Sequence, residues 1–155
     1  MSAPIAMHLN TPEQAMATVL RYFEQLQASD LVHLPLLYCA DAFFKDPFNE
    51  VTGLDAIVRI FAHMFETLLE PRFVITESVQ QGAVCWVSWD FVFAPRSAPQ
   101  RTMTIRGATR FVLREEAGLW RVAVHRDYWD AAEELYEKLP VLGSLMRWLK
   151  KKLAS

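Results

Sequence analysis

Apolar residues recur at helical spacing throughout the first half of the chain. Residues 12–26 carry this pattern behind Thr11, which can cap a helix, and Pro12, which suits the first helical position. The same spacing predicts a short helix over 29–37 and a longer one over 54–70. The first half of the chain is therefore expected to supply three helices.

After Pro71 the pattern changes from helical spacing to alternation. Four stretches rich in β-branched and aromatic residues predict strands over 72–79, 83–94, 101–115 and 119–129. The breaks between them contain glycine, proline and polar residues that are typical of turns. Helices followed by an antiparallel meander are typical of an α+β fold.

Alternation also assigns the side chains of each predicted strand to two faces. In the strand over 83–94, one face is wholly apolar and the other carries Trp86 and Asp90. The apolar face is formed by Val87, Trp89, Phe91 and Phe93. An apolar surface of this size is not expected to stay in water.

In the last strand, His125, Asp127 and Trp129 alternate onto one face. An imidazole, a carboxylate and an indole therefore form one column, which makes this face a candidate site. Asp130 follows at once and is expected to cap a helix.

The composition limits the classes of protein that fit. At 155 residues, 52% hydrophobic and 22% charged, the chain predicts one globular domain over 1–155 with a core over 12–140. A net charge of −2 offers no basic face for a nucleic acid. Cys39 and Cys85 are expected to be buried free thiols in a reducing compartment. The N-terminal residues have no secretion-signal pattern, so we expect a cytoplasmic protein.

No metal site is expected from the spacing of the histidines. His8, His33 and His63 have no carboxylate or cysteine companions at the spacing of metal ligands.

Residues 141–153 predict an amphipathic C-terminal helix. Its apolar side comprises Leu142, Leu145, Met146, Leu149 and Leu153, and its basic residues are Arg147, Lys150, Lys151 and Lys152. Such a helix can pack on the domain, cover the mouth of a pocket or lie on an anionic membrane.

Two segments resemble a known superfamily. The stretch "RYFEQLQASDLVHLPLLYCADAFFKDPFNEVTG" resembles the N-terminal half of the ketosteroid isomerases. The stretch "GLWRVAVHRDYWDAAEELYEKLP" is similar to the end of the limonene-epoxide hydrolases. Both families belong to the nuclear transport factor 2-like (SnoaL-like) superfamily, and the resemblance covers roughly 12–140. It implies a cystatin-like cone, in which a strongly curved antiparallel sheet wraps around N-terminal helices and encloses an apolar pocket.

The resemblance to the isomerases implies two catalytic positions. Tyr22 corresponds to the tyrosine that stabilises the oxyanion, and Asp46 corresponds to the aspartate that shuttles the proton. A third isomerase residue, an aspartic acid that donates a hydrogen bond to the dienolate oxygen, falls on or beside Gly107. The loss of one oxyanion donor can lower the rate by about 10²–10³, so we do not predict a steroid isomerase.

The resemblance to the hydrolases places catalytic aspartates at Asp127 and at or near Asp90. The arginine between those acids falls on Ser88, and the tyrosine and asparagine that help to hold the water fall on Phe44 and Asp46. The arrangement that opens an epoxide is therefore only partly present.

Polyketide cyclases of the same superfamily require less. They use one acid/base carboxylate, sometimes with a histidine, and this chain offers Asp46, Asp127 and His125. The resemblance thus implies binding of a small apolar carbonyl- or epoxide-bearing molecule, with isomerisation, cyclisation or hydrolysis and no cofactor. Trp129, Trp86, Phe44, Phe61 and Phe65 are expected to line the pocket. A ligand-binding or protein-interaction module without catalysis is the alternative.

The superfamily also implies a homodimer through the outer face of the sheet, for which we expect Val87, Trp89, Phe91 and Phe93. Structural roles remain open for the candidate site residues. Tyr22 can be a buried helix tyrosine, Asp46 a turn cap and His125 a core histidine. Asp90 and Asp127 can pair with neighbouring arginines.

Overall fold

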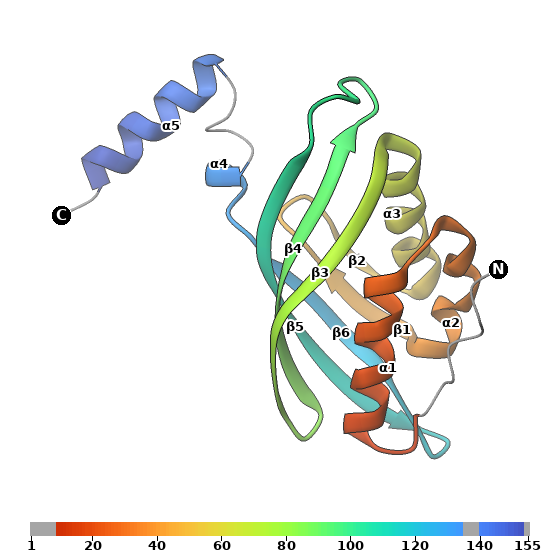
Figure 1. The fold of residues 1–155 in the computed structure, drawn as a ribbon. Coiled ribbons are helices and arrows are strands. Elements are labelled where there is room, and N and C mark those ends of the chain that lie inside the picture. Colours follow the sequence, from red (N-terminus) through yellow and green to blue (C-terminus); the bar gives the residue numbers. More distant parts are fainter. Residues whose placement is uncertain (1–8, 135–139, 154–155) are drawn as a thin grey trace.

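The computed structural model describes residues 9–134 and 140–153. Its centre is a strongly curved six-stranded sheet that wraps around helices, as Figure 1 shows. The strands are β1 (Tyr38–Lys45), β2 (Glu50–Thr52), β3 (Leu68–Gln81), β4 (Val84–Pro95), β5 (Met103–Glu116) and β6 (Leu119–Tyr128). The helices are α1 (Pro12–Gln25), the 3₁₀ helix η1 (Ala28–His33), α2 (Leu34–Leu37), α3 (Leu54–Thr67), α4 (Ala131–Glu134) and α5 (Pro140–Leu153). The expected α+β class is confirmed.

The helices begin as the sequence predicts, but α3 ends early. At the start of α1, the Thr11 side chain accepts a hydrogen bond from the Gln14 amide at 3.2 Å. The helix expected over 54–70 stops at Thr67, and Pro71 lies inside β3. The pairing of β3 with β4 shifts in register around Pro71, so the missing N–H of the proline is accommodated at an irregularity.

The strand order is β2-β1-β6-β5-β4-β3. Strands β3 to β6 form the predicted antiparallel meander, and the β5–β6 turn uses Ala117 and Gly118, whose φ angles of 51° and 80° suit a tight hairpin. One strand pairing departs from the antiparallel pattern. The sheet is not wholly antiparallel, because β1 enters after two helices and pairs with β6 in parallel.

The two faces of β4 are opposite to the expected arrangement. Val87, Trp89 and Phe93 are buried on the concave face, and Phe91 stacks on Phe73 there with ring centroids 4.6 Å apart. These four β4 residues therefore cannot form an outer dimer contact, because they already pack inside the cone. The convex face instead exposes Trp86, at 45% of its surface.

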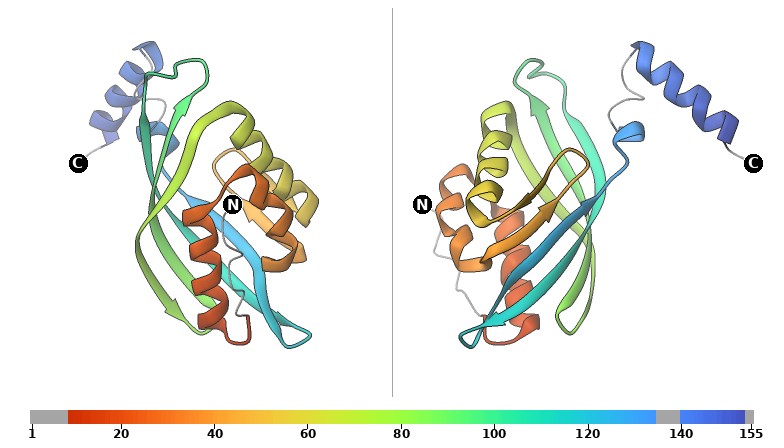
Figure 2. Two further views of the ribbon diagram at one scale, coloured as in Figure 1. Left: turned by 45° about the vertical axis from the view of Figure 1, so that its right-hand side comes forward. Right: turned by 180° about the vertical axis from the view of Figure 1, so that it is seen from behind.

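The chain leaves the sheet at the open end of the cone. Asp130 accepts hydrogen bonds from the amides of Ala132 and Glu133 at 3.0 and 3.1 Å, so its expected role as a helix cap is confirmed. Beyond α4, Figure 1 and the right-hand view of Figure 2 show α5 standing clear of the sheet. None of the helices within 9–134 and 140–153 combines the length and hydropathy that crossing a bilayer requires.

Candidate functional site

An apolar cavity of about 690 Å³ opens between α3 and the concave face of the sheet. Its size suits a small organic molecule, and its walls are mostly aromatic and aliphatic. The apolar lining includes Phe44, Phe48, Val51, Ile60, Phe61, Met64, Phe73, Trp89, Phe91, Phe93, Ile105 and Trp129. Phe44, Phe61 and Trp129, which the sequence suggested as ligand-binding residues, all line this cavity, and their contact with a ligand stays a prediction.

Asp127 lies where this cavity meets a smaller one. The smaller space, of about 30 Å³, is lined by Thr109, His125 and Asp127 together with apolar side chains of α1, α3 and the sheet. It is large enough for a water molecule and offers polar partners to hold one. The Asp127 carboxylate thus borders both an apolar chamber and a water-sized polar one.

Five side chains, called here the Asp127 network, join in one run of hydrogen bonds: Trp89, Thr109, Asp127, His125 and Tyr38. The Trp89 indole donates to the Thr109 hydroxyl at 2.8 Å, and that hydroxyl donates to Asp127 Oδ1 at 2.5 Å. His125 Nε2 lies 2.9 Å from the same Oδ1, and His125 Nδ1 lies 2.7 Å from the Tyr38 hydroxyl. The network brings β1, β4, β5 and β6 together at one carboxylate.

The hydrogen bonds of the network fit one arrangement of donors and acceptors around the His125 ring. Burial, followed by the nearby Asp127 carboxylate, raises the pKa of Tyr38 well above its ordinary value, so its hydroxyl keeps its proton and donates to Nδ1. Nε2 then carries the ring hydrogen and donates to Asp127. The imidazole is surrounded by rings, with Phe44 and Phe111 each 4.7 Å away between centroids.

Only one oxygen of Asp127 is used by the network. The hydrogen bonds from Thr109 and His125 both end on Oδ1. Among the described residues, Oδ2 has no hydrogen-bond partner, and the side chain keeps 17% of its surface accessible. A carboxylate oriented through one oxygen, with the other available beside a cavity, can exchange a proton with a bound molecule.

Asp46 lies at the rim of the cavity, where it holds a turn. Its Oδ1 accepts hydrogen bonds from the amides of Phe48 and Asn49 at 2.8 and 2.6 Å, and the Asn49 side chain contacts both carboxylate oxygens at 3.0 Å. This geometry matches the structural alternative stated for Asp46. The residue still lines the cavity, so it shares the site with Asp127.

Tyr22 is not aimed at the cavity. It is almost fully buried on α1, and its hydroxyl donates to the backbone carbonyl of Asp30 at 2.8 Å. Burial, with Asp30 adding to it, raises the pKa of Tyr22 above its ordinary value. The tyrosine therefore joins α1 to η1, and the geometry matches the buried helix tyrosine stated as its alternative.

The position of the missing isomerase acid is occupied by the Trp89 ring. A Cβ placed on Gly107 would lie only 2.4 Å from Cη2 of that indole, so glycine is what lets the ring lie across β5. The indole N–H is directed to Thr109. No carboxyl can stand at Gly107 while Trp89 keeps this place.

Three further expectations are corrected. Asp90 and Trp86 alternate onto the convex face of β4, opposite the cavity, where Asp90 pairs in register with Arg106. The sequence showed that they share a face but not which side the helices cover. Phe65 packs against the core from α3 and is not among the residues that line the cavity.

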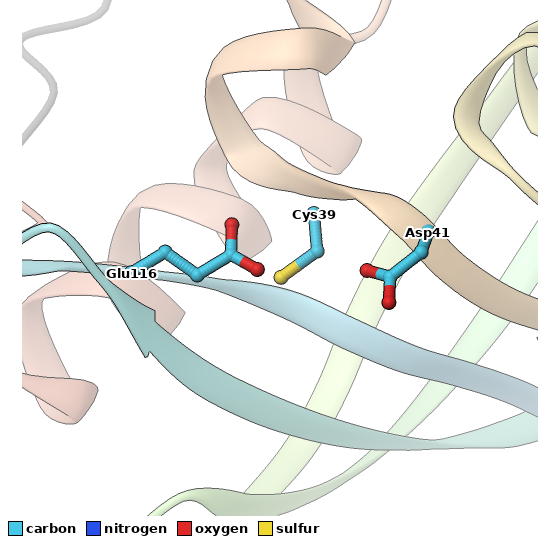
Figure 3. Close-up of side chains that lie close together, drawn as sticks. All are labelled: Cys39, Asp41 and Glu116. Atoms are coloured by element: carbon cyan, nitrogen blue, oxygen red, sulfur yellow. The ribbon is translucent and has the colours of Figure 1, made fainter.

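A separate polar cluster lies at the β1 and β5 strands, where Cys39, Asp41 and Glu116 converge, as Figure 3 shows. Their possible ligand atoms lie within 4.8 Å of one another. The guanidinium of Arg114 already binds both carboxylates, so the cluster has its own cation. Burial raises the pKa of the Cys39 thiol to about 11, which keeps it protonated at neutral pH.

A family model for the SnoaL-like domain matches residues 19–125, more than half of the chain. The chain belongs to the SnoaL-like domain family. No curated protein matches this SnoaL-like domain in sequence.

Solved structures of similar shape confirm the fold of the SnoaL-like domain. A Catenulispora acidiphila protein with a ketosteroid isomerase-like fold, solved with trimethylamine, has a TM-score of 0.64 at 19% identity, over 81% of this chain and 91% of its own. An LEH-like epoxide hydrolase of M. tuberculosis has a TM-score of 0.64 at 16% identity, over 90% and 98%. A protein from Jannaschia, described as a SnoaL-like polyketide cyclase, has a TM-score of 0.65 at 17% identity, over 86% and 92%. At such identities the likeness shows the fold alone.

Sequence reasoning missed three members of the Asp127 network in this SnoaL-like domain. Thr109 had a visible signal, because it is a lone hydroxyl between Gly107 and Phe111 on the concave face of β5. Trp89 was noted only as part of an apolar face. Tyr38 reaches His125 across the parallel β1–β6 pairing, which joins segments 87 positions apart and leaves no mark in local sequence.

Proposed function

We propose that this SnoaL-like domain binds a small apolar carbonyl compound inside the cone and moves a proton on it with Asp127. One observation carries the proposal. Thr109 and His125 hold Asp127 through Oδ1, and Asp127 also lines the apolar cavity of about 690 Å³. A ligand held by the aromatic walls would present its reacting carbon to Oδ2.

The reaction would begin with removal of a hydrogen next to the carbonyl. Oδ2 of Asp127 takes the proton, and the electron pair of the broken C–H bond moves into an enolate. In isomerisation of an unsaturated ketone, the carboxylic acid returns the proton to a different carbon of the conjugated enolate. In cyclisation the enolate carbon attacks a second carbonyl, whose oxygen then takes the proton from the carboxylic acid. The N–H of His125 and the hydroxyl of Thr109 keep the carboxylate oriented between these steps. The proposal requires no cofactor.

Proton transfer is favoured over epoxide opening. The hydrolase resemblance requires a second catalytic acid, for which Asp90 was the candidate, and that residue lies on the convex face of the sheet. The requirement of the cyclases, one carboxylate with a histidine partner, fits the contact of Asp127 with His125.

Binding without catalysis remains the second candidate, and a specific observation favours it. An enolate oxygen needs a hydrogen-bond donor, yet the Tyr22 hydroxyl is occupied by Asp30 and the Trp89 ring fills the place beside Gly107. A domain that kept the cone for storage or transport of its ligand would tolerate both features.

Hydrogen–deuterium exchange on bound ketones separates the two candidates. The protein is incubated in D₂O with apolar ketones sized to the cavity, and deuterium uptake next to the carbonyl is followed by mass spectrometry. Asp127→Asn should lower the rate by about 10²–10⁴. Asp90→Asn is the matched control, since it removes a carboxylate from the opposite face. Ligand binding without exchange by the wild type would establish the binding-only function, and equal exchange by wild type and Asp127→Asn would overturn the proposal.

We also propose a cytoplasmic location, which the two buried free thiols, Cys39 and Cys85, support. Homodimerisation stays a prediction, but the surface proposed for it is no longer the one formed by Val87, Trp89, Phe91 and Phe93. The exposed aromatic residues available for it on the convex face are Trp86 and Tyr128, whose ring centroids lie 5.5 Å apart.

A further inference from the structure

The C-terminal helix carries a charge opposite to that of the rest of the chain. Residues 140–155 hold four of the sixteen lysines and arginines and none of the eighteen acids. The helix segment is therefore +4, while residues 1–139, with twelve cations and eighteen acids, carry −6. A concentration of cations on one short helix is unexpected in a chain whose net charge is only −2.

The apolar positions of α5 follow the spacing expected for one side of a helix. Counted from Leu142, they recur three, four, seven and eleven residues on, at Leu145, Met146, Leu149 and Leu153. Of these side chains, the structure describes Leu145, which is 49% exposed, and Leu149, which is partly exposed; the neighbouring Trp148 is 54% exposed. The Lys152 ammonium lies 5.6 Å above the Trp148 ring, so a cation and an amphipathic aromatic occur together, as they do in helices at a membrane interface.

The length and position of α5 fit a helix that lies on a surface. Its fourteen residues make about 21 Å, too short to cross a bilayer. Figure 1 and the right-hand view of Figure 2 show it clear of the sheet, beyond the end of β6. Trp129, the residue that follows β6, lines the cavity, so the chain leads from the mouth of the cone toward α5.

We propose that α5 binds an anionic lipid bilayer and holds the mouth of the cone near the membrane surface. The leucines enter the boundary between headgroups and acyl chains, and the four cations lie among the anionic headgroups. An apolar molecule dissolved in the lipid would then reach the cavity without crossing water. This last step rests on the proposed function, whereas the binding of α5 to lipid does not.

The positive charge of α5 favours an anionic lipid surface as its binding partner over the rest of the chain, called here the body. The acidic body could attract the cations, but in the structure α5 stands away from it with Leu145 and Trp148 exposed. On a membrane, each basic residue near an anionic surface adds about fivefold in affinity. Four such residues predict a preference for anionic over neutral vesicles of well over tenfold.

Vesicle sedimentation with the full chain tests the proposal. The probes are vesicles of phosphatidylcholine alone and vesicles in which about a third of the lipid is the anionic phosphatidylserine. Binding is expected on the anionic vesicles, at least tenfold weaker on the neutral ones, and weakened by salt. Changing Lys150, Lys151 and Lys152 together to Gln should lower anionic binding at least tenfold.

Two controls make the result specific. Changing Arg21, Arg72 and Arg106 to Gln removes the same charge from exposed positions on the body and should leave binding within about twofold, since these residues lie outside the segment that touches lipid. Asp127→Asn should bind vesicles as the wild type does, so a failure of the catalytic proposal is distinguishable from a failure of this one. Trp148 emission, taken as the difference from Trp148→Phe, should shift to the blue on anionic vesicles.

Other results would overturn the proposal. If the chain does not sediment with anionic vesicles, and Trp148 emission is already blue-shifted without lipid, α5 packs on the body or on another protein. If the Arg21, Arg72 and Arg106 variant loses as much binding as the lysine variant, the attraction is a property of the whole chain and not of α5.

Discussion

Replacing Thr109 with valine is the most direct test of the Asp127 network. The Thr109 hydroxyl accepts a hydrogen bond from the Trp89 indole and donates one to Asp127, and the residue is only 3% exposed. Valine has nearly the same shape, so the change removes both hydrogen bonds and leaves no cavity. It leaves a buried indole N–H without an acceptor and Asp127 without one of its two donors.

The expected magnitude follows from the two contacts. A neutral hydrogen bond such as that from Trp89 contributes about 0.5–1.5 kcal/mol to the free energy of unfolding, and one to a carboxylate about 1.5–3 kcal/mol. We therefore expect Thr109→Val to destabilise the fold by about 2–4 kcal/mol. For a chain of this size, each kcal/mol lowers Tm by about 2–4 °C.

Urea unfolding followed by far-ultraviolet circular dichroism measures the difference, and Thr109→Ser is the matched control. Serine keeps the hydroxyl and loses one methyl group, which costs about 1 kcal/mol. If valine destabilises by less than 0.5 kcal/mol, or by no more than serine does, the hydroxyl does not hold the network together and the reasoning fails. Deuterium uptake by bound ketones should also be slower with the valine variant than with the wild type, because Asp127 loses a contact that orients it.

Two further predictions concern the packing around Trp89 and the buried thiols. Gly107→Ala should destabilise the protein by about 1–3 kcal/mol in urea unfolding, because its Cβ would lie 2.4 Å from the Trp89 ring; unchanged stability would contradict that close contact. Cys39 has a pKa raised to about 11, chiefly by burial, so its folding contribution is complete below the ordinary thiol pKa and is lost as pH rises through about 11. Iodoacetamide labelling read by peptide mass spectrometry should therefore be slow in the native protein up to about pH 10 and fast in guanidinium; equal native and unfolded rates at pH 8.5 would refute this.

Much of the architecture could be predicted from the sequence because it depends on local patterns. The cap at Thr11 and the alternation along β4, β5 and β6 each leave a mark within a few residues. The sequence did not predict which side of β4 faces the helices. Trp86 stands on one face and Trp89 on the other, and alternation separates the two faces without saying which one the sheet curves around.

The candidate site was predicted in part for the same reason. His125 and Asp127 lie two positions apart on one strand, so their shared face follows from the strand alone. Tyr22 matched the spacing of a known catalytic tyrosine, but the direction of its hydroxyl depends on η1, which brings the Asp30 carbonyl within 2.8 Å. Contacts that join distant segments, such as Tyr38 with His125, depend on tertiary pairing that spacing does not encode.

The Trp89 ring across Gly107 also restricts the order in which this protein can change. An acid placed at position 107 collides through its Cβ before its carboxyl reaches the cavity, so it is acceptable only after Trp89 has become smaller. Shrinking Trp89 first removes a large buried ring, at a cost of about 3–5 kcal/mol, and leaves Thr109 without its donor. Each single change is therefore expected to lower stability, because the acid collides with the Trp89 ring and the smaller residue at position 89 leaves a cavity. An evolutionary path from this cone to one with an isomerase-like acid therefore crosses a fitness valley, and a library intended to cross it should randomise positions 89 and 107 as a pair.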